Sequence, residues 1–315
     1  MENNSVSNSP GISTVYSITF ISLLIVEIPS ICCTLLIMIY ICCHWQLMIV
    51  KSLHHHVIFL LILISFLYVT LDLPFIISTY RLGYDYFRTP SFCLWWFWVD
   101  YTISAMSLFL TATASIQRHF LIFNSHWFRI KRTRWSVHFF PLIFCITYPP
   151  LCYIALIYFY PCKTVFPEEE TTCAAPCYGR IILISNLDWV INCIIPILII
   201  VLSNILLICR IVCSRQKVRQ QRHFSKWKKQ KKLFFQLLGF SMLYICGWGP
   251  TTVLSMMKTF IMPDLFNNNP GMNSIQYLVY FVCPLQTFIC IFAMPELVHF
   301  IRIRIIRRFK VVAIH

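Results

Sequence analysis

The sequence predicts an all-α integral membrane protein, a bundle of seven transmembrane helices with its N-terminus outside. Of the 315 residues, 58% are apolar and 12% are charged, and the mean hydropathy is +0.72. Soluble domains are about half apolar and a quarter charged, so a water-soluble fold is not expected. Seven apolar runs are each long enough to cross about 30 Å of hydrocarbon as a helix. We expect these helices at about 15–43, 53–80, 92–122, 136–160, 180–213, 231–257 and 274–298.

The segments before and after these seven helices are short. Residues 1–14 are polar and are expected to form an extracellular tail, in which Asn3 begins the glycosylation sequon Asn3-Asn4-Ser5. The first apolar run has no positive region before it and no small-residue cleavage site. We therefore interpret it as a retained helix, with a cleaved leader as the alternative. Residues 299–315 mix arginines with Ile and Phe, which predicts a short amphipathic helix in the membrane interface and a cytoplasmic tail.

Lysine and arginine predict the orientation of the bundle, because cationic loops stay in the cytoplasm. All but five of the 26 Lys and Arg residues end or follow the first, third and fifth apolar runs or lie in the C-terminal segment. These segments are therefore expected on the cytoplasmic face of a multi-pass plasma-membrane protein. We interpret the net charge of +15 as this asymmetry plus attraction to anionic membrane lipids, and not as a sign of nucleic-acid binding.

The third apolar run has the most specific pattern. It opens with Cys93, carries Asp100 seven residues later, and ends in Ser115-Ile116-Gln117-Arg118-His119. This pattern resembles the third helix of rhodopsin-like G-protein-coupled receptors, which begins with a disulfide cysteine and ends in an Asp/Glu-Arg-Tyr triplet at the same spacing. The resemblance implies that Arg118, flanked by Gln117 and His119, belongs to a switch that contacts a heterotrimeric G-protein. An arginine that only reaches the membrane interface is the alternative interpretation.

Two more helices resemble the same family. Pro196 lies in the middle of the fifth apolar run, and Gly247-Trp248-Gly249-Pro250 in the sixth is similar to the family's Cys-Trp-x-Pro region. Tyr244 stands one turn further inward. The resemblance covers roughly residues 15–310, and it implies a seven-helix receptor in which Tyr244 and Pro250 take part in the switch.

The seventh helix and the third helix depart from the family in the switch itself. The family's Asn-Pro-x-x-Tyr is Met294-Pro295-Glu296-Leu297-Val298 here, which keeps only Pro295. The acidic neighbour of the family's arginine is Gln117 here, so that pairing is weakened. We hypothesise that Glu296, the only acid near the predicted inner face, replaces the missing partner of Arg118.

Three other positions lack the residue that parts of the family use. The second-helix aspartate that binds sodium in the family would fall near Ser65-Phe66, so no such sodium site is expected. The usual tyrosine eight residues after the fifth-helix proline is Asn204. Opsins need a lysine seven residues before the seventh-helix proline, and Phe288 stands there. A retinal photoreceptor is therefore excluded.

Four cysteines fall on the predicted outer side: Cys93, Cys162, Cys173 and Cys177. An even number in an oxidising compartment indicates two disulfides. More chain separates Cys173 than Cys177 from the expected start of the fifth helix, so Cys173 can reach Cys93 more easily. We therefore expect Cys93 to pair with Cys173 and Cys162 with Cys177; the swapped pairing is the alternative.

Carboxylates inside the membrane are candidates for ligand binding, because each is costly in hydrocarbon and needs a partner. Asp72, Asp100 and Asp188 lie toward the predicted outer half, below the acidic run at 168–170, and this arrangement favours a cationic guest. Asp100 occupies the position where the family's biogenic-amine receptors hold the ligand's ammonium. Pairing of Asp100 with Tyr101 or water is the alternative interpretation.

The sixth helix does not match the amine receptors. Thr251-Thr252 follow Pro250 where those receptors have paired aromatics, and the fifth-helix serines are absent. A peptide ligand is therefore favoured over an amine. We expect Trp248, Thr251 and Tyr280 to line the ligand site with the three aspartates. Most of the tryptophans among Trp95, Trp96 and Trp98 are expected to belong to an aromatic belt.

The sequence thus predicts a receptor that converts the binding of an extracellular peptide or amine into G-protein activation by a population shift. The alternatives are a transporter or channel-like bundle, whose acids line a permeation path, and a receptor-shaped protein that binds ligand but signals weakly. No catalytic residue, cofactor or metal site is expected. The His54-His55-His56 cluster has no carboxylate close in sequence, and adjacent histidines do not share a helix face.

Overall fold

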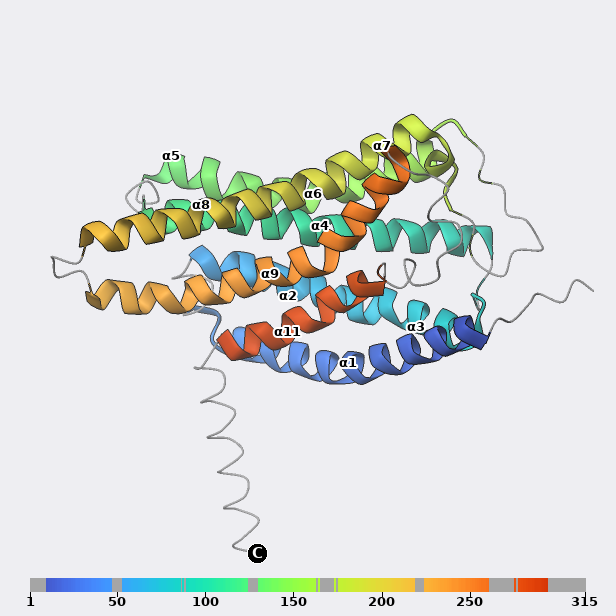
Figure 1. Cartoon of the computed structure of the whole chain (residues 1–315), viewed down its shortest axis with the longest axis horizontal. Helices are drawn as coiled ribbons and strands as arrows, with labels where there is room; N and C mark the ends of the chain where they lie inside the picture. The colour runs from blue at the N-terminus through green and yellow to red at the C-terminus, as the bar shows by residue number, and fades with distance from the viewer. Residues whose placement is uncertain are drawn as a thin grey trace, which may run out of the picture.

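The computed structural model describes residues 10–46, 53–85, 87, 89–123, 130–162, 164, 173, 175–218, 224–260, 275 and 277–293. These residues form helices joined by turns, with no strand among them, and this confirms the all-α prediction. The long helices run back and forth along one axis (Figure 1).

Most of the long helices consist of several helical segments joined end to end, and we call each such series a rod. The first part of the chain forms α1 (Pro10–Cys43), α2 (Leu53–Leu67), η2 (Tyr68–Asp72), α3 (Leu73–Leu82) and α4 (Pro90–Phe123). The middle forms α5 (Lys131–Arg134), η4 (Trp135–Phe139), α6 (Phe140–Ile154), η5 (Ala155–Phe159), η6 (Cys177–Arg180), α7 (Ile182–Trp189), η7 (Val190–Ile194) and α8 (Ile195–Val218). The last part forms α9 (Phe224–Phe260), η8 (Tyr277–Phe281) and α11 (Val282–Ala293).

Five helical rods within the described residues are long and apolar enough to cross a membrane: Tyr16–Cys43, His56–Leu82, Pro90–Phe120, Arg132–Phe159 and Ile182–Arg210. A shorter apolar helix covers Tyr277–Ile291. The helix expected at 231–257 lies within α9, and the one expected at 274–298 overlaps η8 and α11. The described helices therefore indicate a membrane-embedded protein, while crossing by these last two helices stays a prediction.

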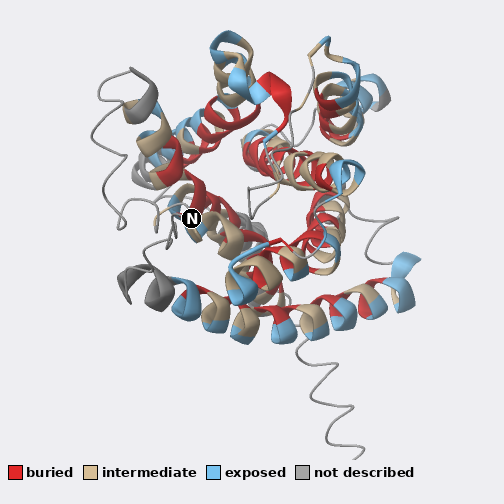
Figure 2. Cartoon of the chain, turned by 90° about the vertical axis from the view of Figure 1, so that its right-hand side faces the viewer, coloured by how far each residue is buried: buried red, intermediate tan, exposed pale blue. Residues whose placement is uncertain are grey.

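The described surface is rich in large apolar side chains, unlike that of a soluble protein, and the interior holds several polar ones beside its apolar core. Large apolar side chains such as Ile25, Phe140 and Leu151 are each at least 65% exposed, whereas Arg118 and Asp72 are buried. Figure 2 shows that the buried residues gather on the sides of the helices that face the middle of the bundle. Exposed apolar side chains are stable in lipid, and polar side chains there need partners inside the protein. This distribution supports the membrane assignment independently of helix length.

Helix α4 is the central element of the bundle, since it packs against α2, α6, α8 and α9. Cys93 stands near its beginning and Arg118 near its end. At about 1.5 Å per residue these positions are roughly 37 Å apart. We call the end of the bundle that contains Cys93 the disulfide end and the other the arginine end.

Three prolines stand two residues after a widened, π-helical turn. Pro74 follows η2, Pro141 follows η4 and Pro196 follows η7. In each case the residue before the proline donates its N–H to the carbonyl five residues earlier, as Leu73 does to Tyr68. A proline ring clashes with the carbonyl four residues before it, and a wider turn moves that carbonyl away. These turns matter because they carry several of the buried polar side chains described below.

Helices α9 and α11 approach closely at Gly247. A Cβ atom at this position would overlap Val282 Cγ2, the side-chain methyl at the start of α11. The other glycine of the same turn, Gly249, has only the side chain of Ile245 nearby, at 4.0 Å. Gly247 therefore permits the contact between the two helices, and Gly249 does not take part in it.

Candidate functional site

Asp72 and Asp100 come together in the half of the bundle nearer the disulfide end. Asp72 closes η2 and is fully buried, and its carboxyl group interacts with that of Asp100 on α4. Ser104, one turn after Asp100, donates a hydrogen bond to Asp100 Oδ1 at 3.5 Å. Tyr280 of η8 is within electrostatic reach of both carboxyls. We call Asp72, Asp100 and Tyr280 the acid-pair site; all three were predicted as ligand-binding residues.

The tryptophans at the start of α4 have different surroundings. Trp96 donates its indole N–H to Asp72 Oδ1 at 2.7 Å, and Trp98 donates to the carbonyl of Pro150 at 3.3 Å. Trp95 is the most exposed of the three. An aromatic belt therefore fits Trp95, but not Trp96, which binds inside the bundle.

Asp188 on α7 has its own set of partners. Its Oδ1 accepts from Asn192 Nδ2 at 2.6 Å, and its Oδ2 accepts from the Tyr178 hydroxyl at 3.3 Å. Burial, and then the nearby Asp188 carboxylate, raise the pKa of Tyr178 above its ordinary range, so this hydroxyl keeps its proton and donates it. Asp188 was predicted to join the other two aspartates, yet both of its oxygens are already bound.

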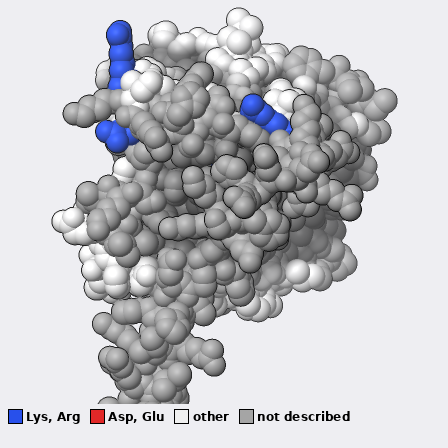
Figure 3. All heavy atoms as spheres, turned by 90° about the vertical axis from the view of Figure 1, so that its left-hand side faces the viewer, with Lys and Arg blue, Asp and Glu red and all other residues white. Residues whose placement is uncertain are grey.

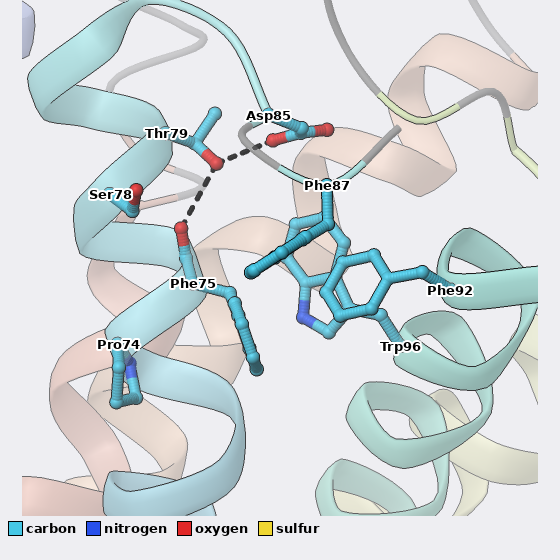
Figure 4. Close-up of a pocket in the computed structure, with 8 residues that line it drawn as sticks. All are labelled: Pro74, Phe75, Ser78, Thr79, Asp85, Phe87, Phe92 and Trp96. Carbon is cyan, nitrogen blue, oxygen red and sulfur yellow. Dashed lines mark hydrogen bonds between the residues drawn. The ribbon is translucent and has the colours of Figure 1, made fainter. Parts of the chain in front are cut away.

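A pocket of about 190 Å³ lies between α3 and the start of α4 (Figure 4). Its wall is mostly aromatic, from Phe75, Phe87, Phe92 and Trp96. Trp96 thus lines this pocket and also binds Asp72, so it connects the pocket with the acid-pair site. Pro74, Ser78, Thr79 and Asp85 complete the lining.

Asp85 fixes the loop around Cys173 at one edge of this pocket, a role that the sequence did not reveal. Helix α3 ends at Gly83, whose φ of 76° allows the chain to turn back. Asp85 is then buried, and it accepts hydrogen bonds from the Thr79 hydroxyl and from the backbone N–H of Cys173, the latter at 2.6 Å. An acid soon after a helix-ending glycine was the only signal for this role.

The structure has two disulfides, Cys93 with Cys173 and Cys162 with Cys177. This is the pairing that the length of chain before the fifth helix favoured, and the swapped alternative is wrong. Together with Asp85, the first disulfide attaches the loop around Cys173 to the beginning of α4 and the end of α3.

In the middle of the bundle, polar side chains join α2, α9 and α11. The buried Tyr244 donates its hydroxyl to Gln286 Oε1 at 2.7 Å, and Gln286 Nε2 donates to the carbonyl of Leu61 at 2.9 Å. Trp248 is buried one turn along α9, against Val282 and its neighbours, and the Thr251 hydroxyl is 3.5 Å from the carbonyl of Gly247 in its own helix. Pro250 lies inside α9. Gln286 is a residue that the sequence alone did not single out.

A cluster of hydroxyl groups joins α1, α2 and α11 at the position where the family's sodium-binding aspartate would fall. Ser65 donates to the carbonyl of Cys283 at 2.6 Å and lies 3.3 Å from the Thr287 hydroxyl. Thr287 also contacts Ser30 and Thr34 of α1. Small hydroxyl residues commonly join membrane helices in this way.

Arg118 is the most deeply buried cation described, with 2% of its surface exposed. Its Nη2 donates to Ser115 Oγ, to Asn204 Oδ1 at 3.0 Å and to Ser241 Oγ, so it joins α4, α8 and α9. Its Nε and Nη1 have no hydrogen-bond partner among the described residues. This geometry does not fit the alternative interpretation, in which the Arg118 side chain only extends to the membrane interface. Asn204, the residue in place of the family's tyrosine, is one of its acceptors.

Gln117 and His119, the sequence neighbours of Arg118, form hydrogen bonds with other helices. Gln117 Oε1 is 3.0 Å from His138 Nδ1, and His138 Nε2 is 3.1 Å from His56 Nδ1, so a chain of hydrogen bonds crosses α4, η4 and α2. His119 Nε2 lies 2.7 Å from the carbonyl of Ser203 on α8. Gln117 therefore binds the next helix and does not replace an acidic partner of Arg118.

Several predicted residues lie outside the described part of the chain. These are Asn3, Pro295, Glu296, the acidic run at 168–170 and the expected amphipathic helix at 299–315. On the arginine end, the described charged side chains that Figure 3 shows are all basic. Their sign agrees with the face that the distribution of Lys and Arg predicts as cytoplasmic.

Two sets of polar residues are thus the features on which a function can be argued. One is the acid-pair site in the half nearer the disulfide end, and the other is Arg118 with its acceptors at the arginine end. No protein-family model matches the chain, and no curated protein matches it.

Proposed function

We propose that the chain is a seven-helix receptor of the plasma membrane, which transmits ligand binding in the disulfide-end half to a heterotrimeric G-protein at the arginine end. The observation that carries this proposal is the binding of Arg118. A buried guanidinium normally needs charged or complete hydrogen-bonded partners. Arg118 instead has three neutral acceptors on one nitrogen, and its Nε and Nη1 have no partner among the described residues, so a further partner can bind there.

The proposed ligand site combines the acid-pair site with the aromatic pocket, which share Trp96. The acids favour a cationic group, and the pocket favours an aromatic or aliphatic group. A short peptide can supply both groups on neighbouring residues, so we favour a peptide over a small amine. The disulfide-end loop, held by Cys173 and Asp85, would cover one side of this site.

The proposed coupling uses the polar contacts between the two ends. Tyr244 and Gln286 join α9 to α11 and α2, and Arg118 joins α4 to α8 and α9. A ligand that moves α9 relative to α2 would therefore change the acceptors available to Arg118. This is a population shift between two arrangements of the bundle, which requires that the ligand bind one arrangement more tightly.

The first test is a screen of the full chain in cells with a panel of G-protein sensors, to which peptide and amine libraries are applied. We expect at least one ligand to activate a sensor, and Asp100→Asn to abolish that response while the protein still reaches the cell surface. Ligand-dependent ion flux with no response from any sensor would favour the transporter or channel-like alternative. Saturable binding with no response would favour a receptor-shaped protein that signals weakly.

The second test changes the acceptors of Arg118. Asn204→Ala and Ser241→Ala should each raise basal signalling roughly tenfold, because a hydrogen bond to a charged group contributes about 1.5–3 kcal/mol and about 1.4 kcal/mol is a tenfold shift. Thr147→Ala is the matched control, since that hydroxyl is exposed and binds only its own helix. Equal basal signalling in all three variants would contradict the proposed role of Arg118.

We further propose that Glu296 is a second partner of Arg118, although it lies outside the described residues. Arg118→Ala should abolish coupling, and Glu296→Gln should raise basal signalling as the acceptor variants do. Basal signalling equal to that of the parent chain in both variants would rule this pairing out.

A further inference from the structure

The aromatic pocket between α3 and α4 lies on the side of the second rod that faces lipid. Pro74 and Ser78 line the pocket. They share one face of the rod with Leu71, because residues three, four and seven apart stand on the same side of a helix. Leu71 and Pro74 are exposed, whereas Ile76 on the opposite side is buried. The pocket is therefore accessible from the surrounding membrane.

The pocket also lies at the depth of lipid head groups. Its walls come from α3, which ends at Leu82, and from the first two turns of α4, which begins at Pro90. The exposed Trp95, which fits an aromatic belt, is next to the lining residue Trp96. Such belts stand at the boundary between hydrocarbon and head groups. A group that enters this pocket from the membrane is therefore a headgroup.

Four aromatic rings make most of the wall suitable for a cation. The Phe75 ring stands at 72° to Phe92 and at 58° to Trp96. The Phe87 ring stands at 51° to Phe92, with the centroids 5.2 Å apart. Figure 4 shows Phe75 and Phe87 reaching toward each other, with Phe92 and Trp96 beside them. Ring faces attract cations, and cages of such rings bind quaternary ammonium groups.

Asp85 adds a negative charge at one edge of the pocket. Its two oxygens accept from neutral donors, the Thr79 hydroxyl and the backbone N–H of Cys173, and no described lysine or arginine forms an ion pair with it. An ammonium with N–H groups needs acceptors of its own, and these oxygens are already bound. A quaternary ammonium has no N–H, so the negative potential of the carboxylate and the rings is sufficient for it.

Arg81 provides the opposite charge just outside the pocket. It is exposed, and it follows Pro74 by seven residues, which places it two turns further along the same side of α3. Arginine binds phosphate oxygens well. A pocket for a quaternary ammonium with an arginine nearby therefore matches a zwitterionic headgroup, in which a phosphate is joined to the ammonium by a short linker.

We propose that this pocket binds the choline group of a phosphatidylcholine-type lipid of the outer leaflet, with Arg81 at the lipid phosphate. The size agrees, since an apolar cavity of about 150 Å³ holds one benzene ring and this pocket measures about 190 Å³. The bound headgroup contacts Trp96, which also donates to Asp72. An apolar group of a peptide ligand would compete with the lipid for the pocket, and only this competition rests on the proposed receptor function.

The test uses the purified full chain in detergent, without ligand or G-protein. It is given equal amounts of phosphatidylcholine and phosphatidylethanolamine with identical acyl chains, and the retained lipid is identified by native mass spectrometry. We expect about fivefold preference for phosphatidylcholine, the size of one or two cation–π contacts. A lipid with an uncharged 3,3-dimethylbutyl group in place of choline should be retained no better than phosphatidylethanolamine.

Three variants locate the headgroup. Phe87→Leu removes one ring, and because Phe87 is 50% exposed the variant should fold normally; its preference for phosphatidylcholine should fall about threefold. Arg81→Gln should weaken retention of both lipids alike, since both have a phosphate, and should leave the preference unchanged. Phe159→Leu is the matched control, because that exposed ring of η5 lies outside the pocket, and it should change neither value.

Four results would overturn the proposal. One is equal retention of the two lipids by the parent chain. Another is retention of the uncharged analogue equal to that of phosphatidylcholine, which would mean that the pocket is merely apolar. The third is a preference that Phe87→Leu leaves unchanged. The fourth is saturable binding of free choline with no preference between the lipids, which would assign the pocket to a soluble ligand. None of these results depends on G-protein signalling, so the receptor proposal is judged by its own tests.

Discussion

At the residue scale, the buried polar side chains of this protein bind partners that are distant in sequence. Arg118 finds Asn204 and Ser241, and Tyr244 finds Gln286. The cost of a polar group in hydrocarbon makes the need for a partner predictable from the sequence. The identity of the partner is not predictable, because it depends on how each helix is rotated about its axis.

The contact between Tyr244 and Gln286 can be measured by a double-mutant cycle. Tyr244→Phe should destabilise the protein by about 1–3 kcal/mol, because it leaves a buried oxygen of Gln286 without its donor. The coupling energy with Gln286→Leu should be smaller, about 0.6 kcal/mol, as for hydrogen bonds between membrane helices. Chemical unfolding in detergent gives both values.

The control for this cycle is Tyr158→Phe, since Tyr158 is an exposed tyrosine of the bundle. It should change the unfolding free energy by less than about 0.5 kcal/mol. A coupling energy near zero between Tyr244 and Gln286 would show that their hydrogen bond does not contribute to stability.

At the element scale, helix type and position follow from apolar runs, but the widened turns do not. The apolar runs expected at about 53–80 and 180–213 place Pro74 and Pro196 inside helices. The structure has a π-helical turn that ends two residues before each of them, and these turns carry Tyr68, Asp72 and Asn192. Such turns often occur at functional sites.

The close approach of α9 and α11 gives a second test at this scale. Gly247→Ala should cost about 1–3 kcal/mol, the usual range for overpacking a filled interior, because valine is stiff about χ1 and its methyl cannot easily move aside. Gly249 is two residues further along α9 and makes no close contact with α11. Gly249→Ala should therefore be neutral or slightly stabilising. The stabilities of the two variants are compared by thermal unfolding.

Val282→Ala provides the rescue, since it removes the methyl that the new Cβ would meet. The double variant should recover most of the stability lost in Gly247→Ala. Equal stability of Gly247→Ala and Gly249→Ala would mean that the helices move apart at no cost.

At the scale of the whole molecule, composition and charge were enough to predict a helical membrane protein. The sequence predicted a shared site for Asp72 and Asp100, but the binding of Asp188 by Tyr178 and Asn192 was not predictable. Hydropathy places each aspartate at a depth along its helix, but it contains no information on which helices are neighbours. The number of membrane crossings and their direction remain predictions from the sequence.

The direction of the bundle can be tested with epitope tags at both ends of the chain. The N-terminal tag should be stained in intact cells, and the C-terminal tag only after permeabilisation, because the cationic segments stay in the cytoplasm. Glycosidase treatment should change the gel mobility of the parent chain but not of Asn3→Gln. The opposite staining pattern would reverse the assignment of every loop.

The close approach at Gly247 also restricts how this protein can change over evolutionary time. A side chain at position 247 is tolerated only if position 282 becomes smaller, because both occupy the same space between α9 and α11. Either change alone passes through a less stable protein, so the two substitutions should be inherited together. Among descendants of this chain, positions 247 and 282 are therefore expected to vary as a pair.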